Sequence, residues 1–263
     1  MSTHDDPLAA PPAAVEVFGT AIGLAERYAG LLAGPGVERG LLGPGEAERL
    51  WDRHLLNCAA VAELVPSPCS LIDLGSGAGL PGIVLAMLLP DVTVTLLEPM
   101  ARRVTFLEEC IQILGLANVG VRRGRAEDVT GQLTADVVIA RAVAPMEKLA
   151  GLAIGLLKPG GVVLAIKGAG AMAEVSRARP ELRRLGARDV EVLQAGSGRV
   201  DPAATVVRFT AGRPRSHAAR PGAPGASGAV GADGPRYSAQ GKAGRGSASL
   251  RRAGPGRGRR GTG

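Results

Sequence analysis

The sequence of 263 residues has no run of 18 or more apolar residues, the length that a membrane-spanning helix needs. Its beginning, MSTHDDPLAAPPAAVEVF, lacks the basic start and following apolar block of a secretory signal. The three cysteines, Cys58, Cys69 and Cys110, are odd in number and have no metal-binding spacing. We therefore expect a cytoplasmic protein with reduced, packed thiols, no membrane association and no bound metal.

The net charge of +7 is unevenly distributed along the chain. From Ala211 to Gly263 there are 11 Arg and Lys against one acid, Asp233, whereas the first 210 residues have 20 basic and 23 acidic residues. This tail has almost no large apolar residues to offset the entropy of ordering, so residues 211–263 are predicted to be disordered. Two interpretations stay open: a solvated extension without function, or an arm that binds RNA phosphates without sequence preference.

Ahead of the tail, short β-type runs alternate with helix-like stretches, a rhythm typical of parallel strands joined by crossover helices. The last two runs share a short link and are predicted to pair antiparallel. Together these patterns favour an α/β fold of the class I S-adenosylmethionine-dependent methyltransferases, Rossmann-like, with a mostly parallel seven-stranded sheet. Strands are expected at 70–74, 92–97, 119–122, 136–140, 162–166, 190–193 and 205–209, and helices at 81–89, 101–114, 146–157 and 173–185.

Two further helical patterns, at 13–32 and 46–64, precede the predicted sheet. The chain is therefore predicted to have four parts. These are a disordered N-terminus at 1–12, a helical cap at 13–66, a methyltransferase domain at 67–210 and the Arg/Gly-rich tail at 211–263.

A glycine-rich turn, GSGAGLPG, follows the first predicted strand. Glycine permits positive φ and lets a ligand approach the main chain closely. The helix that follows is expected to present free N–H groups and the positive end of its dipole to a ligand. Gly77, Gly79 and Gly82 match the G-x-G-x-x-G pattern of dinucleotide-binding folds, so both a dinucleotide and S-adenosylmethionine are candidate ligands.

Acidic residues near this turn favour S-adenosylmethionine. Asp73 would repel a pyrophosphate but could hold the methionine ammonium, and its alternative role is to cap the helix. Glu98, at the end of the next strand, could accept both ribose hydroxyls of either cofactor. Glu127 or Asp128, in GRAEDV, could accept the adenine amino group or cap a short helix.

Several motifs in a fixed order resemble the RsmG family, also called GidB. They are LWDRHLLNCA, DLGSGAGLPGIVLA, LLEPMARRVTFLEE, GRAEDV, ARAVAPMEKL and LAIKG, and the resemblance covers roughly residues 15–210. Members of this family are bacterial methyltransferases that modify N7 of one guanosine in the 530 loop of 16S ribosomal RNA. The resemblance implies S-adenosyl-L-methionine as cofactor and 16S ribosomal RNA in the small ribosomal subunit as partner, and we expect a monomer.

The resemblance also implies roles for individual residues. Gly75 and Leu80 match positions that hold the methionine and sugar portion, Ala126 and Glu127 match the adenine pair, and Arg141 matches the arginine beside the methionine end. The predicted cofactor site therefore consists of Asp73, Gly75, Ser76, Gly77, Gly79, Leu80, Glu98, Ala126, Glu127 and Arg141. One departure is the stretch Gly40-Leu-Leu-Gly43-Pro-Gly45, where many members carry Asn-Leu-Thr.

The segment ARAVAP, after the fourth strand, lacks the acid or amide and the aromatic that cradle an exocyclic adenine amine. Guanine N7 fits better, because its lone pair carries no proton and transfer needs mainly approach and alignment. The predicted catalytic residues are Arg141 for the cofactor carboxylate or an RNA phosphate, Lys167 for a phosphate or guanine O6, and His54 to orient the base or cap helix carbonyls. Arg53 could bind a phosphate. Trp51 is expected to pack the helical cap on the sheet, and its alternative role is to stack on a base.

The sequence is also compatible with other functions: methylation of a small molecule or of another RNA, a dinucleotide-dependent oxidoreductase, and a non-catalytic RNA-binding protein. The oxidoreductase is disfavoured by Asp73. A non-catalytic RNA-binding protein is disfavoured because the acids of the predicted cofactor site are all present.

Overall fold

The computed structural model of the chain describes residues 8–211. The predicted tail from residue 212 and the first seven residues lie outside the described part. The helices are α1 Pro12–Phe18, α2 Ile22–Leu31, α3 Asn57–Ala59, α4 Gly82–Leu88, α5 Ala101–Leu114, α6 Ala126–Val129, α7 Met146–Ile154 and α8 Ala171–Arg184, with irregular turns η1 Gly19–Ala21, η2 Leu32–Gly36, η3 Pro44–Arg49, η4 Leu50–Leu56 and η5 Ala60–Leu64. The strands are β1 Cys69–Leu74, β2 Val92–Glu98, β3 Val119–Arg123, β4 Ala135–Arg141, β5 Leu157–Lys167, β6 Ala187–Ala195 and β7 Ala204–Ala211.

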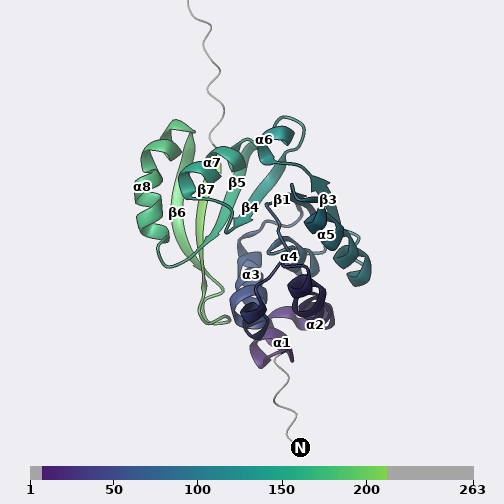
Figure 1. Cartoon of the computed structure of the whole chain (residues 1–263). Coiled ribbons are helices and arrows are strands. Elements are labelled where there is room, and N and C mark those ends of the chain that lie inside the picture. The colour runs from purple at the N-terminus through teal and green to yellow at the C-terminus, as the bar shows by residue number, and fades with distance from the viewer. Residues whose placement is uncertain (1–7, 212–263) are drawn as a thin grey trace, which may run out of the picture. The chain divides into compact units, whose positions relative to one another are not determined.

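The seven strands form one sheet in the order β3-β2-β1-β4-β5-β7-β6 (Figure 1). The first five strands pair in parallel, and β7 is antiparallel to both β5 and β6. All seven predicted strands and the antiparallel terminal pair are therefore confirmed. The chain has the class I methyltransferase fold.

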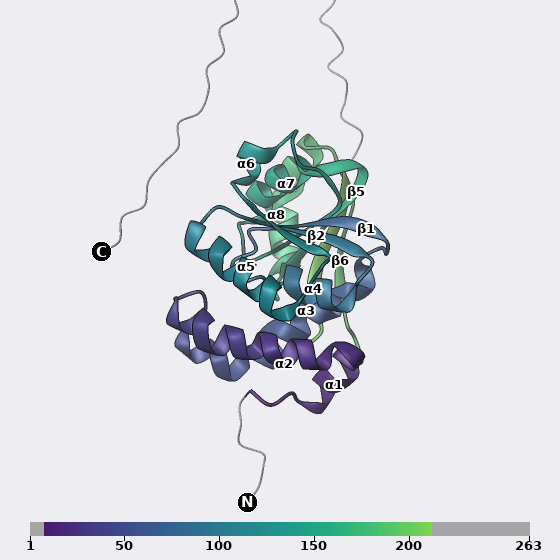
Figure 2. The same cartoon turned by 90° about the vertical axis from the view of Figure 1, so that its right-hand side faces the viewer.

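Helices cover both faces of the sheet, as Figure 2 shows. On one face, α6, α7 and α8 enclose a core that includes Ile72 and Leu74 of β1. On the other face, α4 and α5 cover a core to which the neighbouring β1 residue Leu71 contributes. Both faces are thus withdrawn from water, which explains why β1 reads as an apolar run instead of an alternating pattern.

The predicted helical region ahead of the sheet is present, and it is irregular. Two of its turns, η2 and η4, are π-helical, and η1, η3 and η5 are 3₁₀-helical. Helix α2 contacts α4 and α5, and the buried residues of this region belong to the same core as α4 and α5. The division into a cap at 13–66 and a domain at 67–210 stays a prediction.

The structure differs from the predicted boundaries at several places, and three of them bear on how the chain is divided. Residues 8–12 are ordered in the structure. The Leu8 carbonyl accepts a hydrogen bond from Trp51 Nε1 at 3.0 Å, and α1 begins at Pro12. The predicted disorder of 1–12 therefore does not extend to these residues. Ala211 ends β7 and does not belong to the tail. The helix expected to reach residue 157 stops at Ile154, because Leu157 pairs with Ala135 and starts β5.

Among the described residues, no helix is long and apolar enough to cross a membrane.

Candidate active site at the carboxyl edge of the sheet

The predicted site residues meet at one edge of the sheet. Asp73 is the last but one residue of β1, Glu98 ends β2, Arg141 ends β4 and Lys167 ends β5. These four strands are parallel, so their carboxyl ends lie together, where open α/β sheets bind their ligands.

Asp73 is fully buried and caps the helix after the glycine turn. Its Oδ2 accepts a hydrogen bond from the Gly82 N–H at 2.9 Å. The first N–H of α4 is therefore not free, which corrects the expectation that it faces a ligand. Burial is the largest influence on this carboxyl and raises its pKa to about 7. Its Oδ1 is buried without a hydrogen-bond partner among the described residues, an atom that fits a donor brought by a ligand, such as an ammonium.

The four glycines of the turn serve different contacts. A Cβ at Gly79 would lie 2.7 Å from the Tyr28 hydroxyl, and one at Gly82 would lie 2.7 Å from Asp73 Oδ2. The close approach that these two glycines permit thus comes from within the protein. A Cβ at Gly75 would lie 3.0 Å from a Val143 methyl, whereas at Gly77 it would meet only the Gly75 carbonyl, at 3.9 Å. Of the four positions, the backbone at Gly77 is the most open to a ligand.

Glu98 is buried and engaged on both oxygens. Its Oε2 accepts a hydrogen bond from Gly77 N at 2.9 Å, and its Oε1 accepts one from Met100 N at 3.0 Å. Arg103 lies 3.7 Å from the same carboxylate. Because each carboxylate oxygen has two lone pairs, Glu98 retains acceptor capacity for a hydroxyl beside the bonds it already makes.

The remaining predicted cofactor residues flank this edge. Ser76 is buried and donates its hydroxyl hydrogen to the Asp73 carbonyl at 2.9 Å, and Leu80 is 7% exposed. Ala126 is buried at the start of α6, while Glu127 and Asp128 are exposed in its first turn. The structure thus brings the acidic turn to the carboxyl end of β3, beside the strand that ends in Glu98.

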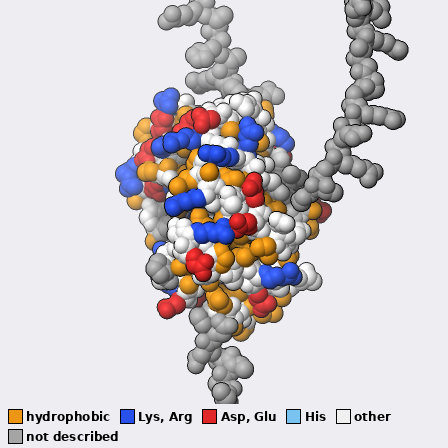
Figure 3. Space-filling view, turned by 45° about the vertical axis from the view of Figure 1, so that its right-hand side comes forward, with side chains coloured by type: hydrophobic (Ala, Val, Ile, Leu, Met, Phe, Trp, Pro, Cys, Tyr) orange, Lys and Arg blue, Asp and Glu red, His pale blue; other side chains and the backbone are white. Residues whose placement is uncertain are grey.

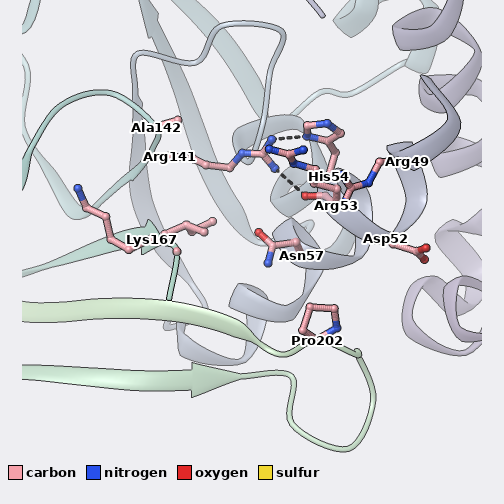
Figure 4. A pocket seen from close by; sticks show the side chains of 11 residues that line it. Arg49, Asp52, Arg53, His54, Asn57, Arg141, Ala142, Lys167 and Pro202 are labelled. Carbon is pink, nitrogen blue, oxygen red and sulfur yellow. Dashed lines mark hydrogen bonds between the residues drawn. The ribbon is translucent and has the colours of Figure 1, made fainter. Parts of the chain in front are cut away.

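A cavity of about 450 Å³ opens next to this edge, between the helical region and strands β4 and β5. Figure 4 shows the Arg141 side chain reaching from the end of β4 toward His54, while Lys167 points away from them. The cavity therefore joins the predicted catalytic residues from three distant parts of the sequence. Its lining residues are Arg49, Asp52, Arg53, His54, Asn57, Arg141, Ala142, Ile166, Lys167, Gly168 and Pro202.

His54 is buried between an acid and Arg141. Its Nε2 lies 2.6 Å from Glu46 Oε2, and its Nδ1 is in hydrogen-bond contact with Arg141 Nη2. The pKa of His54 is lowered, first by burial and next by the positive charge of Arg141, with Glu46 acting in the opposite direction. The ring is therefore neutral at pH 7, and both of its nitrogens are engaged within the protein.

Lys167 lines the cavity, but its ammonium is paired. Nζ donates to Glu174 Oε1 at 2.9 Å and to the Ala144 carbonyl at 3.0 Å. Its side chain is only 12% exposed. To reach this ammonium, a phosphate or a guanine O6 would have to displace these partners or bind beside them. Lys167 thus lines the cavity with its ammonium already bonded within the protein.

Other arginines near this edge of the sheet lie mainly on the surface. Arg102, Arg122, Arg123 and Arg125 are exposed, and Figure 3 shows Lys and Arg side chains interspersed with acids on the face it presents. Arg53 is exposed and its Nη1 donates to Glu46 at 3.2 Å. Trp51 is buried in the core that the helical region shares with α4 and α5, and it packs against Phe18 with the ring centroids 6.2 Å apart, so its ring is not open to stack on a base.

Sequence reasoning missed three residues of this region: Glu46, which holds His54; Cys58, whose Sγ is 3.3 Å from Arg141 Nη1; and Tyr28, which reaches the glycine turn. Glu46 precedes His54 by eight residues across two irregular turns, so no regular helical spacing relates them. The one signal for Tyr28 in the sequence was its place beside Ala25 and Ala29 on the apolar face of a helical pattern.

The family model and the curated relatives agree on one family. The sequence model of the GidB family, described as rRNA small subunit methyltransferase G, matches residues 21–200. A protein named ribosomal RNA small subunit methyltransferase G from Thermobifida fusca is 58% identical over 198 residues, which are 75% of this chain and 84% of that protein. One with the same name from Mycobacterium sp. strain JLS is 50% identical over 220 residues, covering 82% and 96%. A solved SAM-dependent methyltransferase from Aquifex aeolicus has a TM-score of 0.48 at 19% identity, covering 64% of this chain and 98% of that one.

Proposed function

The chain belongs to the rRNA small subunit methyltransferase G family, and from this premise we propose that it methylates N7 of one guanosine in the 530 loop of 16S ribosomal RNA. It is an S-adenosylmethionine-dependent rRNA methyltransferase. We also propose that the protein is a cytoplasmic monomer and that it acts on RNA of the small ribosomal subunit.

The single observation that carries the choice of target atom is the chemistry of the cavity wall. Arg141 is a cation there, and His54 is a neutral imidazole with both nitrogens already bonded. Neither group is suited to remove a proton from a base. Guanine N7 needs no such group, because its lone pair attacks directly and no proton leaves.

S-adenosylmethionine supplies, when bound, a methyl group activated on a sulfonium. We assign its binding to the carboxyl edge of β1 to β3, where Asp73 would take the ammonium, Glu98 the ribose hydroxyls and the turn at Ala126 and Glu127 the adenine. Gly75, Ser76, Gly77, Gly79 and Leu80 would form the turn beneath it. The observation that supports this fit is the unpartnered Asp73 Oδ1 at the base of the turn.

A dinucleotide fits this edge poorly. Asp73 covers the helix N-terminus that would otherwise receive a diphosphate, and Glu98 occupies the Gly77 N–H. Two carboxylates close to a diphosphate would repel it, whereas a sulfonium and an ammonium are attracted to the same charges.

The residues of the cavity would then orient the RNA. We propose that Arg141 holds an anionic oxygen, either the cofactor carboxylate or a phosphate. Lys167 is proposed to act at a phosphate or guanine O6 after it leaves Glu174, and His54 to act through Arg141. Because the methylated base becomes cationic, Arg141 favours the reaction only if its charge stays away from the base, and its contacts with Cys58 and the Arg53 carbonyl hold it against the helical region.

The proposal is tested with small subunits from a strain that lacks the endogenous enzyme. Purified protein and tritiated S-adenosylmethionine should place one methyl group per subunit on the 16S ribosomal RNA, and the variant Glu98→Ala should abolish this labelling. Labelling of a small molecule in a cell extract, with none on the subunit, would contradict the proposed substrate. A melting shift with NAD and none with S-adenosylhomocysteine would contradict the cofactor; at 100 times its dissociation constant the true ligand adds about 2.7 kcal/mol of stability.

A further inference from the structure

Three polar side chains form a line from the surface to the cavity. Glu46 lies in η3, His54 in η4 and Arg141 at the end of β4. Glu46 Oε2 is 2.6 Å from His54 Nε2, and His54 Nδ1 contacts Arg141 Nη2, as the dashed line in Figure 4 marks. The exposed fraction of these side chains falls from 29% at Glu46 to 6% at His54.

The partners of His54 determine where its proton lies. A guanidinium has only donors, so the nitrogen that faces Arg141 must be the acceptor. An ionised carboxylate has only acceptors, so the nitrogen that faces Glu46 must carry the hydrogen. His54 is therefore the neutral Nε2–H tautomer, and protonation of Nδ1 would place an N–H against the guanidinium.

This arrangement holds Arg141 without neutralising it. In the part of the chain that the structure describes, no carboxylate forms an ion pair with Arg141. Its other acceptors are weak or long: the Cys58 sulfur at 3.3 Å and the Arg53 carbonyl at 3.4 Å. The neutral ring thus fixes the guanidinium in place while its full charge remains available to an anion in the cavity.

We propose that Glu46 is a positioning residue for the methyl transfer: it fixes the hydrogen of His54 on Nε2, so that Nδ1 holds the Arg141 guanidinium on the cavity wall for an anionic oxygen group. The inference rests on the proposed function. The anion is either the carboxylate of the cofactor or a phosphate of the RNA, and the two sources give different results below.

The line also predicts how activity depends on pH. His54 is faced by Glu46 from η3, by Arg141 from β4 and by Arg53 of its own turn. Glu46 raises the pKa of His54, whereas burial, Arg141 and Arg53 lower it. Protonation of His54 releases Arg141, so activity falls at acid pH. Removing the charge of Glu46 lowers the pKa of His54 further and therefore moves this fall to a lower pH.

Three variants test the proposal: Glu46→Ala, Glu46→Gln and the control Glu48→Gln, an exposed glutamate two residues further along the same turn. The RNA methylation rate is measured from pH 5.5 to 8.5 at saturating S-adenosylmethionine, so that weaker cofactor binding by protonated Asp73 does not shape the profile. Glu46→Ala should lower kcat/KM at pH 8 on the order of tenfold. Glu46→Gln keeps an acceptor for Nε2–H, so it should recover most of this loss in kcat/KM. Its activity should fall at a lower pH than that of the wild-type protein. Glu48→Gln should match the wild type.

Two binding measurements locate the anion. If Arg141 holds the cofactor carboxylate, Glu46→Ala weakens S-adenosylhomocysteine binding in calorimetry; if it holds a phosphate, that affinity stays and KM for the RNA rises. Either result supports the positioning role. An equal loss of kcat/KM in Glu46→Ala and Glu46→Gln, with an unchanged pH profile, would overturn the positioning role, because that pattern indicates a structural role only.

A readout independent of activity separates this inference from the proposed function. The ¹⁵N shifts of the His54 ring, assigned with a His54→Gln spectrum, should show Nε2–H and a bare Nδ1 at pH 7.5. A charged ring or the Nδ1–H tautomer would overturn the positioning role, even with an active enzyme. If the wild-type protein transfers no methyl group while the ring shows Nε2–H, the proposed function fails and the geometry of the line remains.

Discussion

The Tyr28 hydroxyl of α2 donates a hydrogen bond to the Ala78 carbonyl at 2.7 Å, and this bond ties the helical region to the glycine turn. Tyr28 is completely buried, and burial holds the pKa of its hydroxyl well above the usual value, so it is a donor at every accessible pH. The conformation of the predicted cofactor turn thus depends on a residue 50 positions earlier in the chain.

We expect Tyr28→Phe to weaken cofactor binding more than its effect on folding alone would suggest. The change leaves the Ala78 carbonyl without its buried donor, which costs about 1–3 kcal/mol of stability. The loosened turn should also raise the dissociation constant of S-adenosylhomocysteine severalfold, measured by calorimetry below the melting range. Ser176→Ala is the control, since it removes an exposed hydroxyl bond within α8. A dissociation constant equal to that of the wild type would contradict a role for Tyr28 in the cofactor turn.

Alanine at two glycines of the turn should have different effects. Gly79 has φ +99° and a Cβ there would lie 2.5 Å from Ile83, so Gly79→Ala should lower the melting temperature strongly. At Gly77, with φ +59° and open space, alanine costs roughly 1–2 kcal/mol of backbone strain. Gly77→Ala should therefore fold and lose affinity for S-adenosylhomocysteine. If it folds and binds like the wild type, the ligand does not approach the backbone there.

Cofactor affinity should depend on pH through Asp73. Burial raises the pKa of this carboxyl to about 7, so it is ionised above pH 7 and protonated below. If it holds the cofactor ammonium, S-adenosylhomocysteine binding should weaken from pH 8 to pH 6, toward tenfold per unit below pH 7. Asp73→Asn should bind weakly at pH 8 and lose this slope. A wild-type affinity that does not change between pH 8 and pH 6 would contradict the assignment.

The same group affects stability without ligand. The folded pKa of Asp73 lies above the usual 3.8, so its contribution to stability is fully present below pH 3.8 and is lost as the pH rises through about 7. Asp73→Asn can still accept from the Gly82 N–H. The substitution should therefore lower the free energy of unfolding, measured in urea, by less at pH 8 than at pH 5. The opposite order would show that the ionised carboxylate is stabilised in the fold.

The strands were predictable because each contains a short β-type run between turn residues, either apolar throughout or alternating with polar residues. Helix α5 was also predicted with its observed bounds, since it ends at Gly115, which adopts the left-handed conformation that stops a helix. The meeting of Asp73, Glu98, Arg141 and Lys167 followed from parallel strand order alone. The partners that set their chemistry did not follow, because Glu46, Tyr28 and Glu174 reach these residues through tertiary packing that has no sequence period.

The tail beyond residue 211 carries a prediction that the sequence alone supports. If its basic residues bind RNA phosphates, deletion of residues 212–263 should flatten the dependence of RNA affinity on salt and leave S-adenosylhomocysteine affinity unchanged. Filter binding at several salt concentrations checks this. An unchanged salt slope would favour the interpretation as a solvated extension.

Chemical cleavage of the RNA detects methylation at N7 of guanosine directly. Small subunits from a strain without the enzyme are incubated with the protein and S-adenosylmethionine, and their 16S ribosomal RNA is treated with borohydride and aniline, which cut at N7-methylguanosine. We expect one new cut, at a guanosine in the 530 loop, that is absent when Glu98→Ala protein is used. Methylation of the RNA with no cut, or with a cut outside that loop, would contradict it.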